Sequence, residues 1–184
     1  FAEVHPDGKG FSTYILKSGR NKAEKSVEFD WDSAIEIQDF ALDKKLGYFV
    51  IKNGTIYSFD SAKIRVAYQV ADRQYMLPYS LSCQNGVLYF SDICNQAVYQ
   101  LDGSRAKLLY GKEDFEKITS GQLGQDILET INVTGEGKEQ ILSVTWNNRV
   151  TEIGMNRSQD VSPSSEMNYT RTSVLLLGLR YFCL

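Results

Sequence analysis

The chain has 184 residues, of which 42% are hydrophobic, 12% aromatic and 23% charged, and its formal net charge is −3. These values are those of an ordinary folded domain with a sizeable core, so disorder is not expected. The negative charge argues against nucleic acid or an anionic membrane as the main partner. The sequence contains no run of about 20 apolar residues, so no membrane-spanning helix is expected.

The first predicted strands follow a polar loop at the beginning of the sequence. His5, the only histidine, lies in this loop, which spans residues 5–8. Residues 11–15 and 26–29 then carry aromatic and β-branched side chains that are typical of strands. We expect them to be the last two strands of a first small sheet.

The next two units of the chain resemble each other. Four short strands are predicted between residues 37 and 70, and four more between residues 77 and 110, with turn residues between them. Asn85-Gly86 is a strong hairpin signal in the second unit. The tyrosines superpose at a shift of 41 or 42 residues, with Tyr48 on Tyr89, Tyr57 on Tyr99 and Tyr68 on Tyr110.

Weaker signals continue the pattern to residue 153. The connection at residues 111–126 contains one predicted helical turn, and three strands are predicted at 127–132, 140–144 and 149–153. A unit of about 42 residues with four strands has the period and strand count of a propeller blade. We predict an all-β fold, a partial β-propeller of about four four-stranded antiparallel blades over residues 1–158.

Neighbouring blades are expected to stack face to face, because one four-stranded sheet cannot bury both of its faces alone. A β-sandwich is the alternative fold, since it also has short strands and frequent turns. The sandwich does not account for the regular recurrence of the tyrosines, so the propeller is preferred.

One stretch resembles the YWTD repeat of six-bladed propellers in lipoprotein-receptor-like proteins. It runs Leu88-Tyr89-Phe90-Ser91-Asp92 and continues with Val98 and Leu101-Asp102-Gly103-Ser104, where the family has roughly LYWTD, an aliphatic residue and LDGS. The match covers about 25 residues, with Phe and Ser in place of Trp and Thr, and is only architectural elsewhere. NHL and gluconolactonase-like propellers share similar features. The resemblance implies an incomplete six-bladed ring.

A closed ring of six such units would need about 250 residues, so we expect the remainder of the propeller to come from sequence outside this chain. An open arc leaves strand edges and blade faces uncovered, which predicts poor solubility for the piece alone. Residues 159–184 turn polar and then apolar, do not fit a blade, and are expected to form a poorly ordered tail.

Cysteines and glycosylation signals bear on the compartment. Three cysteines leave at least one unpaired within the chain, and the predicted hairpin separates Cys83 from Cys94, which disfavours a bridge between them. No CxxC pair is present, so a zinc site is not expected. Four sequons favour an extracellular or secreted glycoprotein, and they begin at Asn53, Asn132, Asn156 and Asn168.

The usual catalytic constellations are missing from the sequence. With His5 as the only histidine and the cysteines far apart, we expect no conventional Ser-His-Asp, Cys-His or His-metal site. No phosphate-binding glycine motif is present either. We therefore predict no catalytic residue, no metal ligand and no required cofactor, which favours a binding protein over an enzyme.

Candidate ligand-binding residues lie in loops that propellers place on one face. Asp92 and Asn95 fall in the loop after the second strand of their blade, and Arg73 and Tyr75 fall in the connection before that blade. Tyr and Arg are common at the cores of interfaces. The alternative for Asp92 is structural, in which it fixes its loop by accepting backbone hydrogen bonds, and the YWTD resemblance also implies this role.

Two functions are considered. The first is an extracellular, non-enzymatic propeller module that binds a protein partner through its loop face. The second is a calcium-dependent hydrolase of the gluconolactonase-like group, in which Asp, Asn and Glu oxygens would hold Ca²⁺. We favour the first, because the usual catalytic residues are not evident.

Overall fold

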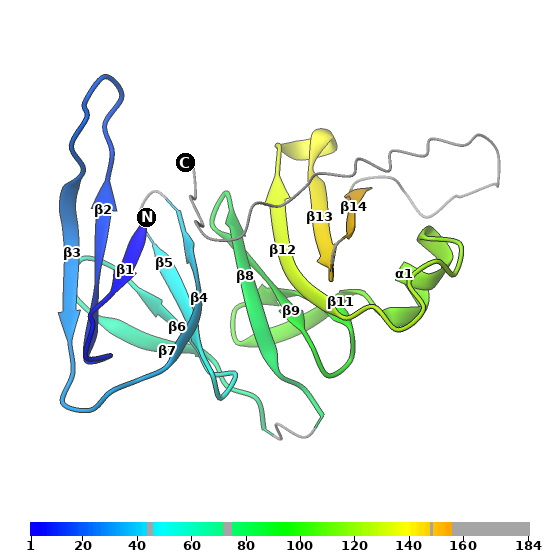
Figure 1. Ribbon diagram of the computed structural model, residues 1–184, viewed down its shortest axis with the longest axis horizontal. Helices are drawn as coiled ribbons and strands as arrows, with labels where there is room; N and C mark the ends of the chain where they lie inside the picture. Colours follow the sequence, from blue (N-terminus) through cyan, green and yellow to red (C-terminus); the bar gives the residue numbers. More distant parts are fainter. Residues whose placement is uncertain (44–45, 72–74, 148, 156–184) are drawn as a thin grey trace.

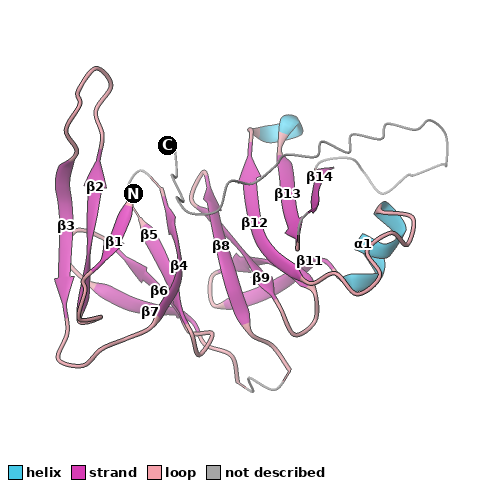
Figure 2. Cartoon of the chain, in the orientation of Figure 1, coloured by secondary structure: helices cyan, strands magenta, loops and turns pink. Residues whose placement is uncertain are grey.

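The described part of the computed structural model covers residues 1–43, 46–71, 75–147 and 149–155. These residues form four antiparallel sheets that follow one another along the chain and stand side by side, as Figure 1 shows. Strands dominate the fold, and a short α-helix lies beside the last sheet (Figure 2). No helix among the described residues has the length and apolar character needed to cross a bilayer.

Each sheet is a meander in which consecutive strands are neighbours. The first is β1 (Ala2–Val4), β2 (Gly10–Ile15) and β3 (Glu24–Asp30). The second is β4 (Ile37–Leu42), β5 (Gly47–Ile51), β6 (Ile56–Phe59) and β7 (Ile64–Tyr68). The third is β8 (Pro78–Gln84), β9 (Val87–Asp92), β10 (Ala97–Asp102) and β11 (Arg105–Tyr110). The fourth is β12 (Leu128–Thr134), β13 (Ile141–Trp146) and β14 (Arg149–Gly154), preceded by α1 (Lys112–Ile118).

This architecture is a partial β-propeller, as predicted, and its sheets have three, four, four and three strands. The helical turn predicted in the connection at residues 111–126 is α1. Sequence reasoning missed β1, because three residues are too few to show an alternating pattern. The predicted tail, residues 159–184, lies outside the described residues, and so does Arg73.

In the second strand of a blade, successive side chains point to opposite faces and pack against the two neighbouring sheets. In β5, Tyr48 and Val50 point into a core shared with the third sheet, whereas Phe49 points into a core shared with the first. In β9, Phe90 faces the second sheet and Tyr89 faces the fourth. Because successive side chains of a strand point to opposite faces, one strand supplies two cores. The described residues thus form three cores, one at each junction between sheets.

The sequence repeat has a direct structural counterpart. Phe49 stacks on Tyr57 with ring centroids 5.0 Å apart and planes 13° from parallel. Phe90 stacks on Tyr99 in the same way, at 5.3 Å and 13°. The recurring tyrosines therefore mark equivalent positions in two blades, as the superposition of the sequence units predicted.

The two end faces of the arc are polar. On the first sheet, Ser12 pairs with Glu3 of β1 and Glu28 of β3, so these three side chains share the face turned away from the second sheet. On the fourth sheet, the corresponding face carries Thr130, Asn132, Thr134, Ile141, Ser143, Thr145, Val150 and Glu152, none of which is buried. Polar end faces favour the solubility of stacked repeats, and the expectation of poor solubility stays a prediction.

Candidate functional site

Asp92 is the organising residue of the predicted loop face. It ends β9, is fully buried, and its Oδ1 accepts hydrogen bonds from the backbone N–H groups of Leu77 and Cys94, both at 2.9 Å. One carboxylate oxygen thus joins the connection that enters the blade to the loop between β9 and β10. This is the structural alternative considered for Asp92, and the carboxylate is not presented to solvent.

Asn95 extends this junction to the surface. Its side-chain amide donates to Asp92 Oδ2 and to the carbonyl oxygen of Tyr75, each at 2.5 Å. Tyr75 itself is 69% exposed. The structure therefore brings three of the four predicted residues together, with Tyr75 and Asn95 at the surface and Asp92 beneath them.

The described residues contain no group of three or more His, Cys, Asp or Glu side chains placed to hold a metal ion. The Asp92 carboxylate, which the calcium alternative would use, instead accepts two backbone N–H groups and the amide of Asn95. No observation favours the calcium-dependent hydrolase, so it stays a prediction.

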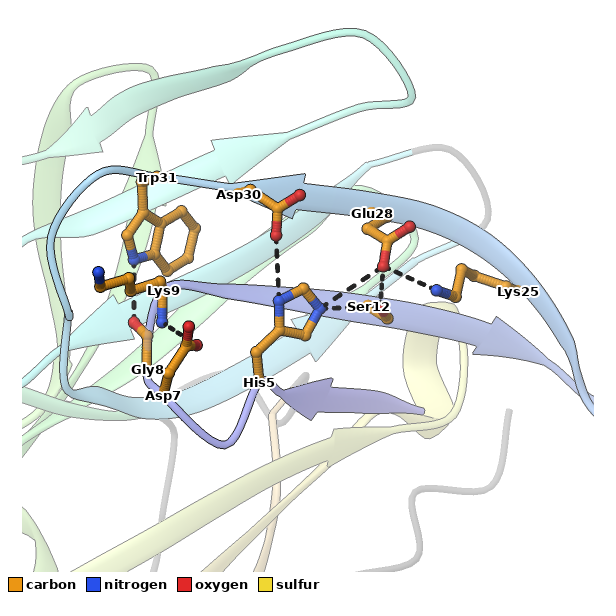
Figure 3. A network of polar contacts seen from close by, with 9 residues as sticks. All are labelled: His5, Asp7, Gly8, Lys9, Ser12, Lys25, Glu28, Asp30 and Trp31. Carbon is orange, nitrogen blue, oxygen red and sulfur yellow. Dashed lines mark hydrogen bonds and ion pairs between the residues drawn. The ribbon is translucent and has the colours of Figure 1, made fainter.

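His5 lies within a polar network on the outer face of the first sheet (Figure 3). Its Nδ1 is 3.1 Å from Asp30 Oδ1, and its Nε2 is 3.1 Å from Ser12 Oγ and 3.8 Å from Glu28 Oε1. Sequence reasoning did not foresee this contact of one histidine with both a serine and an aspartate, and the expectation of no conventional catalytic site stays a prediction. A single histidine suffices, because its two ring nitrogens can contact Asp and Ser at once.

This arrangement resembles a catalytic triad only in its order of contacts. Ser12 is 2% exposed and its hydroxyl also donates to Glu28 at 3.4 Å, so no substrate carbonyl can approach its oxygen directly. Glu28 is in turn paired with Lys25 at 2.7 Å, and this hydrogen bond is the main cause that lowers the pKa of Glu28. The network joins the β1–β2 turn to β2 and β3 and supplies the polar end face described above.

A large groove lies over the innermost strands, and sequence reasoning did not find it. Its volume is about 1040 Å³, and it is lined by segments of the first sheet, by β4, β8 and β12, by single residues of β5 and β6, and by neighbouring turns. The lining includes Asp43, Asn85 and Glu136, which follow the ends of β4, β8 and β12. These strand ends are opposite to the loop face of Asp92 and Asn95, because β9 returns antiparallel to β8. The groove is therefore a separate surface from the predicted one.

Cys83 and Cys94 are both free thiols with different surroundings. Cys83 is half-buried, and burial is the main cause that raises its pKa to about 12, with the charge of Asp43 adding to the effect. Cys94 is exposed on the loop face, beside Asn95. The Cys83–Cys94 bridge, which the sequence disfavoured, is not present.

Two of the four predicted glycosylation sites lie within the described residues. Asn53 is in the β5–β6 turn, where its side-chain oxygen accepts a hydrogen bond from Thr55 N–H at 2.9 Å. Asn132 is exposed in β12 and lines the groove. Asn156 and Asn168 lie outside the described residues. Glycosylation stays a prediction for all four.

Comparisons with known proteins show similarity of this chain to solved structures in fold only. No protein-family model and no curated protein matches this chain. The WD40 β-propeller domain of Doa1 superposes with a TM-score of 0.41 and 13% identity over 65% of this chain and 37% of that one. A chain of a nidogen/laminin complex superposes with a TM-score of 0.46 and 14% identity over 79% of this chain and 68% of that one. The chain thus spans little more than a third of the Doa1 chain. The assignment of the propeller fold rests on the sheet order and the cores described above.

Proposed function

We propose that this chain is part of an extracellular, YWTD-type propeller that binds a protein partner through its loop face without catalysis. The observation that carries the proposal is the bridge formed by Asn95, which holds the backbone of exposed Tyr75 against buried Asp92. A loop that is already ordered loses less conformational entropy on binding, so such a bridge raises affinity. Exposed tyrosines at ordered positions are frequent energetic centres of protein interfaces.

The sequence supports the same proposal. Asp92 is the last residue of the LYWTD-like segment, so the residue that anchors the loop face belongs to the motif that suggested the family. The sequon at Asn53 lies in the β5–β6 turn, where the asparagine is partly exposed, and sequons are typical of extracellular chains.

The test measures binding to purified secreted and matrix proteins arrayed one at a time. Any partner found is compared on three proteins: the unchanged chain, Tyr75→Ala, and Val66→Ala on the exposed outer strand β7. We expect Tyr75→Ala to weaken binding by at least about tenfold and Val66→Ala to leave it unchanged. Equal binding by all three proteins would place the interface elsewhere and contradict the role of the loop face.

A further inference from the structure

We propose that Asn85 is a site of spontaneous deamidation, and that the isoaspartate formed there weakens the β8–β9 hairpin. Asn85 precedes Gly86 in the turn of this hairpin. In Figure 1 the β8–β9 turn rises at the same end of the arc as the β2–β3 hairpin. The inference goes beyond the loop-face function, because this turn lies at the opposite end of β9 from Asp92.

The reaction needs only the chain itself and water. The backbone nitrogen of Gly86 attacks the side-chain Cγ of Asn85 and closes a succinimide ring. The side-chain amide nitrogen and the proton of the attacking nitrogen leave together as ammonia. Water then adds to either carbonyl carbon of the ring and opens it, so the products are aspartate and isoaspartate. In isoaspartate the main chain runs through the side-chain carbon and is longer by one methylene group.

The turn leaves the reacting atoms accessible. Asn85 and Gly86 are both exposed, and within the described part of the chain the side-chain amide of Asn85 makes no hydrogen bond. Apart from its chain neighbours, a Cβ placed on Gly86 would meet only Asp43 Oδ2, at 3.9 Å. The side chain of Asn85 therefore has room to swing toward the glycine nitrogen. Glycine also has no side chain of its own to hinder the attack.

The native turn limits the rate of the reaction. Asn85 and Gly86 have φ angles of 53° and 77°, as in the two-residue turns of type I′ that match the twist of a hairpin. Gly86 N–H donates to Asp43 Oδ2 at 2.6 Å, and this hydrogen bond must break before the nitrogen can attack. The attack therefore needs a local opening of the turn, and such an opening costs less free energy at an exposed tip than in a core strand.

Asn53 provides a control within the same chain, because it also precedes a glycine. Its Oδ1 accepts a hydrogen bond from Thr55 N–H at 2.9 Å, which fixes the side chain. Gly54 is buried, and a Cβ placed on it would lie 3.0 Å from both Leu77 Cδ1 and Pro78 Cδ. Opening of the β5–β6 turn thus breaks more contacts, and we expect Asn53 to react more slowly than Asn85.

Isoaspartate in the β8–β9 turn would disturb the hairpin. A two-residue turn fixes the pairing of Gln84 with Val87, and an additional methylene group does not fit this closed geometry. The two strands supply Leu81, Leu88 and Phe90 to the core between the second and third sheets. A strained turn should therefore lower the stability of the chain. Aspartate keeps the normal backbone length and should have a smaller effect.

The test follows deamidation in the purified chain at neutral pH and body temperature. Samples taken over several weeks are digested, and the peptides that contain Asn85, Asn53 and Asn21 are compared by mass spectrometry, with isoaspartate identified by its enzymatic methylation. Asn21 is exposed but precedes a lysine, so it reports the effect of exposure without a following glycine. We expect Asn85 to react at least about tenfold faster than each of the other two. A rate at Asn85 no higher than that at Asn53 or Asn21 would overturn the proposal.

The denatured chain separates the effect of sequence from that of structure. In guanidinium chloride Asn85 and Asn53 should react at similar rates, since each precedes a glycine and neither is held in a turn. A difference between them that persists unchanged after denaturation would mean that the fold does not select the site, and would overturn the structural argument.

The consequence for the hairpin is measured on chain that has been aged and enriched in isoaspartate. We expect this form to unfold at a lower urea concentration than Asn85→Asp, because both carry the new charge and only the aged form has the longer backbone. Asn85→Gln, aged in parallel, controls for other damage, because glutamine would have to close a larger ring and reacts far more slowly. Equal loss of stability in aged Asn85→Gln, or no loss in the isoaspartate form, would overturn the proposed weakening of the hairpin.

Discussion

The carboxylate of Asp39 in β4 accepts a hydrogen bond at 2.8 Å from the hydroxyl of Ser80 in β8, which lies 41 residues further along the chain. The oxygen of the same hydroxyl accepts the backbone N–H of Ile131 in β12 at 3.3 Å. Two side chains thus connect the innermost strands of three sheets. These contacts also occupy backbone groups that an edge strand would otherwise expose to another chain.

Ser80→Ala tests this connection. The substitution removes one donor from the buried Asp39 carboxylate, which keeps its bond from Leu81 N–H, and removes the side-chain acceptor of Ile131 N–H, so we expect a cost of about 1–3 kcal/mol in the free energy of unfolding. Urea denaturation measures the loss. Ser104→Ala, at an exposed turn, is the matched control and should change the free energy of unfolding by less than about 0.5 kcal/mol. Equal stability of the two variants would show that the connection contributes nothing.

Asp92→Ala should loosen the loop face as well as destabilise the fold. It removes the acceptor for Leu77 N–H and Cys94 N–H, so we expect a loss of about 1–3 kcal/mol. Amide exchange of residues 93–96 should accelerate more than that of β13, because these residues lose their anchor directly. Asp102→Ala, at the exposed end of β10, is the control. Uniform acceleration throughout the chain would mean that Asp92 stabilises the fold but does not order the loop.

The repeated architecture could be predicted from the sequence because its signals are local. Tyr48-Phe49 and Tyr89-Phe90 each place two aromatic side chains on opposite faces of a strand, and each pair fills two cores. The shift of 41 residues between the two pairs also separates Asp39 from Ser80. Polar residues at equivalent positions of the repeat were therefore the signal that could have revealed the connection between the inner strands.

The groove and the His5 network could not be predicted in this way. Asp43 and Glu136 line one groove only because the sheets place the ends of their inner strands around one space. His5 meets Asp30 through a turn and a hairpin that together bring the beginning of the chain onto β3. Such proximity depends on how the sheets pack and twist, and strand patterns carry no information about either.

Thiol reactivity should distinguish the two described cysteines. In a Cys183→Ser background, a disulfide reagent at about pH 8 should modify exposed Cys94 in the native protein and Cys83 only after denaturation. A pKa of about 12 leaves about one part in 10,000 of Cys83 as thiolate at that pH, and the thiolate is the reactive form. Cys94→Ser should abolish the native reaction. Rapid modification of Cys83 in the native state would contradict the buried environment.

Alkaline pH should destabilise the protein. Burial is the main cause that raises the pKa of Cys83 from 9.0 to about 12, and it also raises the pKa values of Tyr48, Tyr68, Tyr99 and Tyr110 above 10.0. The folded state therefore keeps protons that the unfolded state loses, so stability is retained below about pH 9 and falls as the pH rises toward 12. Urea denaturation at several pH values measures the decline. Cys83→Ala should make it shallower, and an unchanged slope would mean that this thiol does not contribute.

Phe11 holds the first sheet to the second, and Phe11→Ala should detach it. The side chain is fully buried, and its ring centroid lies 4.9 Å from that of Phe59 and 5.3 Å from that of Phe49. Removing a buried phenylalanine costs about 3–5 kcal/mol, because the cavity that remains is only partly refilled. The outer face of the first sheet is polar and has no second core to retain it, so the loss should fall on β2 and β3 first.

Native-state amide exchange resolves this effect. In Phe11→Ala, the amides of β2 and β3 should exchange far faster, while those of β9 and β12, which belong to the other two cores, stay close to their original rates. Phe1→Ala, which removes a ring that stacks at 4.9 Å on Tyr14 but is 43% exposed, is the control and should change little. Equal acceleration of all four strands would mean that the arc unfolds as one cooperative unit, so that the junction between the first two sheets stabilises the distant sheets as strongly as its own.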